Sequence, residues 1–206
     1  MKLAAQKPPA VAIARRAFIK SAVAGAALIA IPGVVAAREW IELWPALLRP
    51  GRRRDYATNA PRALAFNNVH TGESIRTVYW ERGAYVPDAL HQLNYFFRDF
   101  RANEVKPIDP RLLDLLSELH ANLGATQPFD LISGYRSAAT NAWLAAQSEG
   151  VARHSMHVEG KAADIHLPGV ELTLLRRAAL ALAEGGVGFY PRSGFVHVDT
   201  GRVRRW

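Results

Sequence analysis

Residues 155–167 read Ser-Met-His-Val-Glu-Gly-Lys-Ala-Ala-Asp-Ile-His-Leu. In the second half of this stretch polar and apolar residues alternate, which predicts a strand with one face in the core. Asp164 and His166 share the polar face of that strand. The first half predicts a loop with a tight turn at Gly160, and such a turn can fold His157 back over the strand that carries Asp164.

A second stretch of the same kind lies near the end of the sequence. Residues 195–199 read Phe-Val-His-Val-Asp, so His197 and Asp199 share one face of a predicted strand while the two valines point into the core. Two strands of this type can direct several side chains into one cleft. The sequence has no cysteine, so any metal must be bound by His, Asp or Glu side chains.

His157, Asp164 and His197 are the candidate metal ligands in this pattern. Three nitrogen and oxygen ligands with an open fourth position are typical of catalytic zinc, which acidifies a bound water molecule. The spacing alone leaves an alternative open, because His–Asp pairs at such separations are common and a single histidine is often a structural or surface residue.

The segments around these strands predict a mixture of strands and helices. Apolar and turn residues predict a hairpin over 64–80, and the stretch 129–133 predicts a short strand. Helical spacing of apolar residues predicts helices over 87–101, 109–123, 137–148 and 171–184. The expected fold class is therefore α+β, with the helices gathered on an antiparallel sheet.

Length and charge limit the classes of function. A chain of 206 residues has room for one catalytic domain with a hydrophobic core. The formal net charge is +8, but residues 1–37 contain five basic residues and no acid, which leaves about +3 for the remainder. This small excess does not favour nucleic-acid binding, and no nucleic-acid partner is expected. The cluster Arg49–Arg54 is interpreted as a linker, with contact to an anionic membrane or wall surface as the alternative.

The N-terminal residues have the parts of an export signal. Basic residues precede a short apolar run over 21–31, and small residues follow it. The pair Arg15-Arg16 resembles the twin-arginine signal, which is recognised by a receptor for folded proteins. Pro32 leaves the apolar run short for a membrane span. We expect cleavage after Ala36 or Ala37, and an uncleaved anchor is the alternative.

Three ordered motifs resemble those of a known family. Residues 155–164 (S-x-H-x-x-G-x-A-x-D) and 195–199 (F-V-H-V-D) resemble the two signature motifs of the zinc peptidases related to D-Ala-D-Ala peptidases and the hedgehog signalling domain. Residues 132–137 (Ile-Ser-Gly-Tyr-Arg-Ser) resemble the third motif. Within that family, the sequence is most similar to the twin-arginine-exported murein endopeptidases of Gram-negative bacteria. Further shared segments are Asn67–Glu73, Asn94–Asp99 and Gly185–Ser193.

The resemblance implies a set of roles for particular residues. His157, Asp164 and His197 would bind Zn²⁺, and Arg136 would lie in the cleft and hold a substrate carbonyl or stabilise the charge that develops on it. From the residues alone, a surface arginine near a helix cap is the alternative for Arg136. The fold implied is hedgehog/DD-peptidase-like, with a small antiparallel sheet and helices packed around it.

These observations divide the chain into three parts. We expect a twin-arginine-type signal peptide over 1–37, a linker with a short amphipathic segment over 38–62, and a zinc peptidase domain over 63–206. The exported domain is expected in the periplasm and has no predicted transmembrane segment once the signal is removed.

The sequence departs from the family in one respect, the general base. Many relatives carry a Glu, Asp or His a few residues before the last zinc ligand, but residues 191–196 here offer none. The candidate bases are Asp199, His166 and His154. Asp199 has a second interpretation, because it can instead orient His197 through a hydrogen bond to its ring.

The function that the resemblance implies is a periplasmic zinc endopeptidase that hydrolyses cross-links between the stem peptides of peptidoglycan. Two alternatives stay open at this point. One is a carboxypeptidase that removes terminal D-alanine, and the other is a non-catalytic, zinc-stabilised domain that binds the cell wall. No protein partner can be named from the sequence.

Overall fold

The computed structural model describes residues 60–147, 152 and 154–206, and everything below concerns these residues. The predicted signal peptide over 1–37 and nearly all of the predicted linker over 38–62 lie outside them. Among the described helices, none is both long and apolar enough to cross a bilayer.

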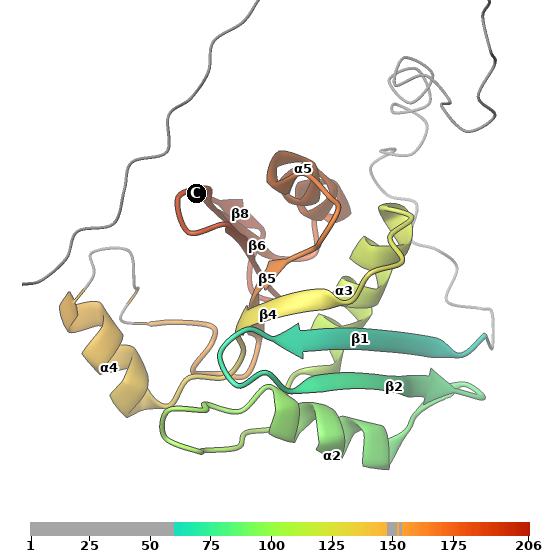
Figure 1. Ribbon diagram of the computed structural model, residues 1–206, viewed down its shortest axis with the longest axis horizontal. Helices are drawn as coiled ribbons and strands as arrows, with labels where there is room; N and C mark the ends of the chain where they lie inside the picture. Colours follow the sequence, from blue (N-terminus) through green and yellow to red (C-terminus); the bar gives the residue numbers. More distant parts are fainter. Residues whose placement is uncertain (1–59, 148–151, 153) are drawn as a thin grey trace, which may run out of the picture. The chain divides into compact units, whose positions relative to one another are not determined.

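Eight strands form a single mixed sheet with the order β3-β2-β1-β4-β5-β7-β6-β8 (Figure 1). Most neighbouring strands run antiparallel, but β1 is parallel to β4 and β6 is parallel to β8. The strand bounds are β1 Arg62–Asn68, β2 Ser74–Glu81, β3 Ala84–Tyr85, β4 Phe129–Ser133, β5 Ala162–His166, β6 Gly186–Tyr190, β7 Phe195–Asp199 and β8 Arg204–Arg205.

The prediction of a small sheet is wrong, and the predicted antiparallel pairing holds for most but not all of the neighbouring strands. Three of the eight strands, β3, β6 and β8, were not predicted. β3 and β8 have two residues each, and β6 begins with Gly-Val-Gly, so none of them shows a long alternating pattern. β1 and β4 can pair in parallel because the chain between them, which includes α2 and α3, provides the long connection that parallel neighbours need.

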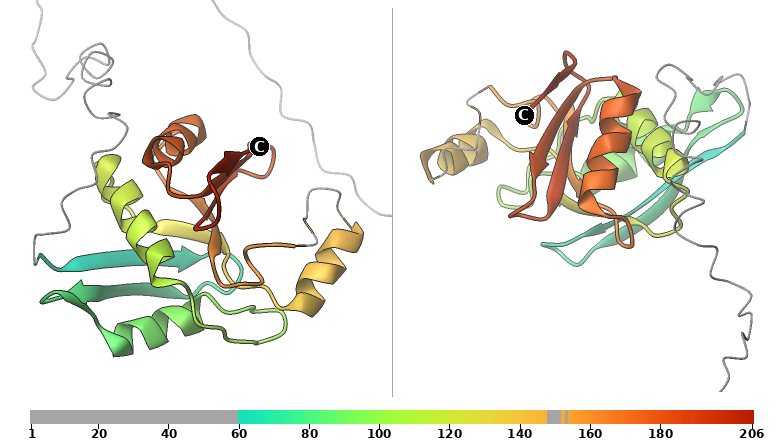
Figure 2. Two further views of the ribbon diagram at one scale, coloured as in Figure 1. Left: turned by 180° about the vertical axis from the view of Figure 1, so that it is seen from behind. Right: turned by 90° about the horizontal axis from the view of Figure 1, so that it is seen from above.

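Three of the helices in the described residues pack against the sheet. α2 (Pro87–Phe96) lies along β2, whereas α3 (Pro110–Asn122) and α5 (Leu172–Leu182) contact each other and cover β1 and the β6–β7 pair. The view from above in Figure 2 shows α3 and α5 side by side. α4 (Ala138–Gln147) projects away from the sheet in Figure 1. The predicted α+β class is confirmed.

The core lies between the sheet and the helices that cover it. β1 contributes Leu64 and Phe66, both buried, and the ring of Phe66 lies 5.1 Å from that of Phe97 and 5.8 Å from that of Phe129. In the middle of the sheet Ile165 of β5 is fully buried. Residues that alternate with these core residues therefore point to the opposite face of the sheet.

Most predicted elements are confirmed with small differences at their ends. These are the hairpin over 64–80, the strand over 129–133, the two strands that carry Asp164 and His197, and the helices that begin near 109, 137 and 171. Asp109 caps α3 by accepting a hydrogen bond from Arg111 N at 3.0 Å.

The helix predicted over 87–101 is too long, because α2 ends at Phe96. The residues that follow bind a distant turn instead of continuing the helix. The Phe97 carbonyl accepts a hydrogen bond from Tyr135 N (2.8 Å), and the Asp99 carboxylate accepts one from Ser137 N (2.9 Å). These long-range contacts outweigh the local preference for one more helical turn.

Candidate metal centre

The polar face of β5 and β7 lies opposite the core. The two strands are antiparallel neighbours, and Asp164 lies directly across from His197. Because Ile165 and Val196 are buried in the core, Asp164 and His197 project from the other face of the sheet. Both side chains are still buried, at 4% and 7% exposure, because the loop that carries His157 lies over them.

Three donor atoms converge on this face. His157 Nε2 lies 3.2 Å from Asp164 Oδ1 and 3.1 Å from His197 Nδ1. His197 Nδ1 and Asp164 Oδ1 are 2.8 Å apart. In the part of the chain that the structure describes, these are the only three His, Cys, Asp or Glu side chains close enough together to hold a metal ion. The structure therefore brings the predicted ligand set together.

The outer partners of the two imidazoles decide where their protons lie. His157 Nδ1 lies 2.6 Å from the Gly134 carbonyl oxygen, which can only accept, so we assign a proton to Nδ1. His197 Nε2 lies 3.0 Å from Asp199 Oδ2 and carries a proton for the same reason. The three inner atoms, His157 Nε2, His197 Nδ1 and Asp164 Oδ1, then all present lone pairs to one another.

This arrangement of donors fits a metal ion. Three lone pairs so close together repel one another unless a cation lies among them, which is either a proton on one imidazole or a metal ion. In a tetrahedral zinc site with ligand distances of about 2.0–2.1 Å, neighbouring ligand atoms are about 3.3 Å apart. The observed separations of 2.8–3.2 Å are close to that value. Two imidazoles and one carboxylate are also a ligand set that catalytic zinc uses.

The pKa shifts of His157, Asp164 and His197 also bear on metal binding. Burial lowers the pKa of His157, which keeps this imidazole in the neutral form that binds metals. Burial alone would raise the pKa of Asp164, but its interactions with the imidazoles of His157 and His197 outweigh burial and lower it. For His197, burial opposes protonation, yet hydrogen bonds to Asp164 and Asp199 outweigh it and raise the pKa. A metal ion would therefore compete with a proton for His197 Nδ1.

The loop over 155–161 holds His157 in place, and its glycine turn is as predicted. Gly160 has a φ of +69°, and a side chain there would collide with the backbone of Pro107. The Gly160 carbonyl accepts a hydrogen bond from Asp109 N (2.9 Å), which connects the loop to the N-cap residue of α3.

The turn after β4 positions both Gly134 and Arg136. A side chain at Gly134 would collide with Phe97, so this position requires glycine for the close approach of two backbone segments. Asp99 binds the same turn through Ser137 N. The segment that ends α2 therefore supports the carbonyl that orients His157 and the arginine that follows it.

Arg136 lies beside the three ligand candidates, with its side chain only 11% exposed, so the surface alternative is wrong. Its Nη2 donates to Asp164 Oδ2 (2.8 Å) and its Nε donates to Ser133 Oγ (3.0 Å). Nη1 has no partner among the described residues. The guanidinium thus balances the charge of Asp164 and keeps one nitrogen available for a substrate oxygen.

Asp199 lies behind His197, on the side away from the inner atoms. It is fully buried, and both of its oxygens accept several hydrogen bonds. Oδ2 accepts from His197 Nε2 (3.0 Å) and Arg204 Nη2 (2.7 Å), and Oδ1 accepts from Gly186 N, Gly201 N and Arg204 Nη1. No lone pair is left for a water molecule, so this geometry gives no support to Asp199 as the general base and fits the orienting role instead.

His166 lies on the same face of β5 as Asp164. It follows Asp164 by two positions on β5, which is about 6.6 Å along the backbone. Its Nδ1 lies 3.1 Å from Asp130 Oδ2 on β4, and its side chain is 38% exposed. His166 is therefore beside the ligand cluster without belonging to it. His154, the third candidate, is exposed on the segment before the loop.

β6 and β8 complete the site on the side away from Arg136, and sequence reasoning missed this part. Gly188 lies across from His197, and a side chain at that position would collide with the indole of Trp206. The rings of Trp206 and His197 have centroids 5.2 Å apart. The alternating glycines at 186 and 188 were an available signal, because glycine within a strand often marks the close approach of another group.

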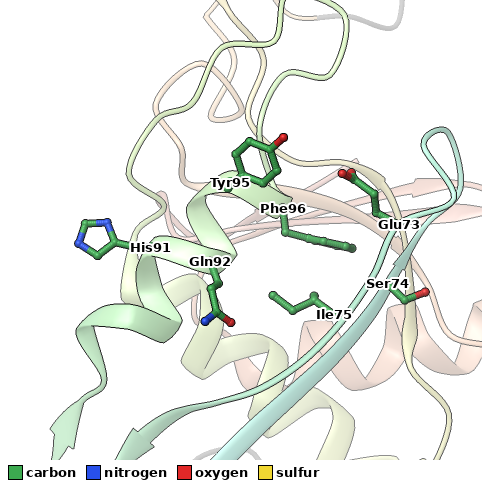
Figure 3. Close-up of a pocket in the computed structure, with 7 residues that line it drawn as sticks. All are labelled: Glu73, Ser74, Ile75, His91, Gln92, Tyr95 and Phe96. Carbon is green, nitrogen blue, oxygen red and sulfur yellow. The ribbon is translucent and has the colours of Figure 1, made fainter.

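An open hollow lies elsewhere on the molecule, between β2 and α2 (Figure 3). Its lining residues are Glu73, Ser74, Ile75, His91, Gln92, Tyr95 and Phe96. None of the three ligand candidates lines this hollow, so it is separate from the chemistry described above.

Comparison with known proteins finds relatives over the same part of the chain. Residues 56–206 match the family described as peptidoglycan L,D-endopeptidase MepK. The chain is 51% identical over 150 residues to the peptidoglycan L,D-endopeptidase MepK of Escherichia coli (strain K12), covering 73% of this chain and 82% of the relative. It is 43% identical over 151 residues to the probable peptidoglycan L,D-endopeptidase MepK of Haemophilus influenzae, covering 73% and 81%.

Among solved structures, the L-Ala D-Glu endopeptidase ChiX of Serratia marcescens matches 45% of this chain and 65% of that chain. The sequence identity is 18% and the TM-score is 0.30. A TM-score this low does not relate the two folds.

Proposed function

The chain belongs to the family of the peptidoglycan L,D-endopeptidase MepK, and we propose that it is a zinc-dependent L,D-endopeptidase that hydrolyses peptide bonds in peptidoglycan. The observation that carries the zinc-dependent activity is the convergence of three lone pairs, from His157, Asp164 and His197, each held from behind by a second group. All of these residues lie within the matched region over 56–206.

When bound, zinc supplies Lewis-acid activation of a water molecule and of the peptide carbonyl. The protein side chains hold and orient the reacting groups. Arg136 Nη1 stabilises the negative charge that develops on the carbonyl oxygen, because this nitrogen lies on a guanidinium already fixed by Asp164. Asp199 keeps the ring of His197 in the orientation that presents Nδ1 inward, and Arg204 fixes Asp199 in turn.

We assign the role of general base to His166. It lies on the same face of β5 as Asp164, and Asp130 binds its Nδ1, which leaves Nε2 to accept a proton from water. His166→Gln should lower kcat by about 10²- to 10⁴-fold while the zinc content is unchanged. An unchanged kcat in this variant would exclude His166 as the base.

The N-terminal sequence supports the location that we propose, which is the periplasm after export by the twin-arginine route. In this division residues 1–37 are the signal peptide, 38–62 are a linker and 63–206 are the peptidase domain. Fractionation of a Gram-negative host that expresses the full chain should find the protein in the periplasm. Replacing Arg15 and Arg16 by lysine should retain the chain in the cytoplasm, and continued export would contradict the assigned route.

Digestion of purified peptidoglycan tests the proposed activity directly. The zinc-loaded chain should convert cross-linked muropeptide dimers into smaller products, which mass spectrometry resolves. Release of D-alanine alone would instead indicate a carboxypeptidase, and intact peptidoglycan with retained zinc would indicate a non-catalytic wall-binding domain. His157→Ala is the control for ligation, and an undiminished zinc content in that variant would contradict the assigned ligand set.

A further inference from the structure

The ligand cluster lies in the middle of a row of residues that crosses four neighbouring strands. Ser133 of β4 lies across from Asp164 of β5, which lies across from His197 of β7, which in turn lies across from Gly188 of β6. Strands are about 4.8 Å apart, so the row is about 14 Å long. This length corresponds to about four residues of an extended peptide.

The two ends of this row have opposite chemical character. At the β4 end, Ser133 binds the guanidinium of Arg136, which has a nitrogen available. At the β6 end, the indole of Trp206 covers Gly188 in the place that a side chain would otherwise fill. A peptide that lies across the cluster would therefore meet a cation on one side and an aromatic ring on the other.

Trp206 is held rigidly in this place. Its backbone pairs with β6, since Trp206 N donates to the Val187 carbonyl (3.2 Å) and Phe189 N donates to the Trp206 carbonyl (3.1 Å). Its Nε1 donates to Tyr190 Oη at 2.8 Å, which sets the orientation of the ring. The guanidinium of Arg204 lies 4.9 Å from the ring centroid. A ring fixed by these contacts loses little further freedom when a ligand binds it.

Despite these contacts, Trp206 leaves 47% of its surface exposed next to His197. Burial in the core does not account for a tryptophan in this setting. A fixed indole that keeps about half of its surface exposed beside a candidate metal ligand is a preformed apolar surface for part of a substrate.

We propose that Trp206 is a specificity-determining residue whose indole contacts an aliphatic side chain of the peptide substrate, on the side of the scissile bond opposite Arg136. The contact binds the ground state and the transition state alike, because it is remote from the bond that breaks. This inference rests on the proposed function, since it requires that the ligand cluster hydrolyses a peptide.

Steady-state hydrolysis of purified muropeptide dimers by the zinc-loaded full chain tests the proposal. Trp206→Ala should raise KM about tenfold, and kcat and zinc content should change less than about twofold. Trp206→Phe keeps an aromatic ring over Gly188 and should give a smaller rise in KM. Trp143→Ala is the matched control, because Trp143 is 55% exposed on α4 and outside this row, and it should leave KM unchanged.

The other outcomes decide against the proposal. An unchanged KM for Trp206→Ala would show that the indole does not contact the substrate. A fall in zinc content, or in kcat alone, would show that Trp206 only supports His197. A wild-type chain that binds zinc but hydrolyses no muropeptide would overturn the proposed function itself, which is a different result from either of these.

Discussion

The regions around Asp164 and Asp199 are built from similar parts. Both carboxylates are buried on the same face of the sheet, both bind His197, and each pairs with an arginine, Arg136 at 2.8 Å and Arg204 at 2.7 Å. The difference lies in what their oxygens do. Asp164 turns Oδ1 toward two imidazole nitrogens, whereas both oxygens of Asp199 are occupied by hydrogen-bond donors.

This difference distinguishes the proposed ligand, Asp164, from Asp199, which supports a proposed ligand. In Asp164, one oxygen faces the lone pairs of two imidazole nitrogens, an arrangement that suits a bound cation. In Asp199, both oxygens accept hydrogen bonds from N–H groups only, an arrangement that suits the orientation of the His197 ring. The surroundings lower the pKa of both groups, because burial is outweighed by hydrogen bonds and nearby positive charge. The pKa alone therefore does not distinguish the two roles, but substitution can.

The largest effect is expected at Asp164. Asp164→Asn keeps the shape of the side chain but removes the charge that a metal ion requires, and it also removes the negative charge that pairs with Arg136. We expect the loss of nearly all bound zinc and of measurable muropeptide hydrolysis, as determined by elemental analysis and by mass spectrometry. Full zinc content in this variant would remove Asp164 from the ligand set.

The next largest effect is expected at Arg136, and the loss of kcat should be larger there than at Arg204. Arg136→Ala removes the nitrogen that we assign to the developing oxyanion, so kcat should fall by about 10²- to 10³-fold. Arg204→Ala removes the guanidinium that binds Asp199 and lies against the ring of Trp206, neither of which is assigned to the oxyanion, and a loss of about tenfold is expected. Rates measured at saturating zinc give this comparison, and equal losses would show that both arginines are merely supports.

Asp199→Asn should lower zinc affinity by about 10- to 100-fold, because it weakens the hydrogen bond that orients and polarises His197. Titration with free zinc should restore most of the activity of this variant. If kcat at saturating zinc stayed low while the affinity was normal, Asp199 would act in the chemistry after all.

The smallest effect is expected at Asp99, a buried carboxylate away from the ligand cluster that serves as a reference. Burial alone would raise its pKa, but hydrogen bonds from Thr140, Ser137 and Ala102 outweigh burial and lower it. Because the folded-state pKa lies below the unfolded value of about 3.9, Asp99 adds stability above about pH 4. That contribution is lost as the pH falls through the folded-state pKa.

Asp99→Asn should accordingly lower the Tm by about 3 °C at pH 7 and by much less at the lowest pH at which the protein stays folded. Thermal unfolding in the presence of a chelator measures this effect without a contribution from the metal. An equal loss at both pH values would show that the charge of Asp99 does not stabilise the fold.

The strands that carry Asp164 and His197 could be predicted because apolar residues that point into the core alternate with polar residues over 163–167 and 196–199. The same pattern placed Asp199 and His166 on the same face of the sheet as Asp164 and His197. Strand periodicity gives the face on which a side chain lies, but it does not give the partners of its atoms. Which oxygen points inward depends on donors such as Gly186 N and Gly201 N, which belong to other segments.

Other features of the structure could not be predicted from local sequence patterns, because they depend on contacts between distant segments. The end of α2 depends on Phe97 and Asp99 binding the turn around Gly134, which follows more than 30 residues later. β8 has only two residues, and it forms because it pairs with β6. The position of Trp206 depends on that pairing, so the pattern of the neighbouring residues in the sequence could not predict it.

The register of β5 and β7 has a consequence for the binding of the proposed metal ion. Ile165 and Val196 lie across from each other in the core, and a slip of one residue would push Asp164 into it. Apolar burial therefore directs Asp164 and His197 to the same face of the sheet without the help of a metal ion. Stripping the ion should leave a folded apoprotein, and adding it back should restore activity at the rate of binding rather than of refolding.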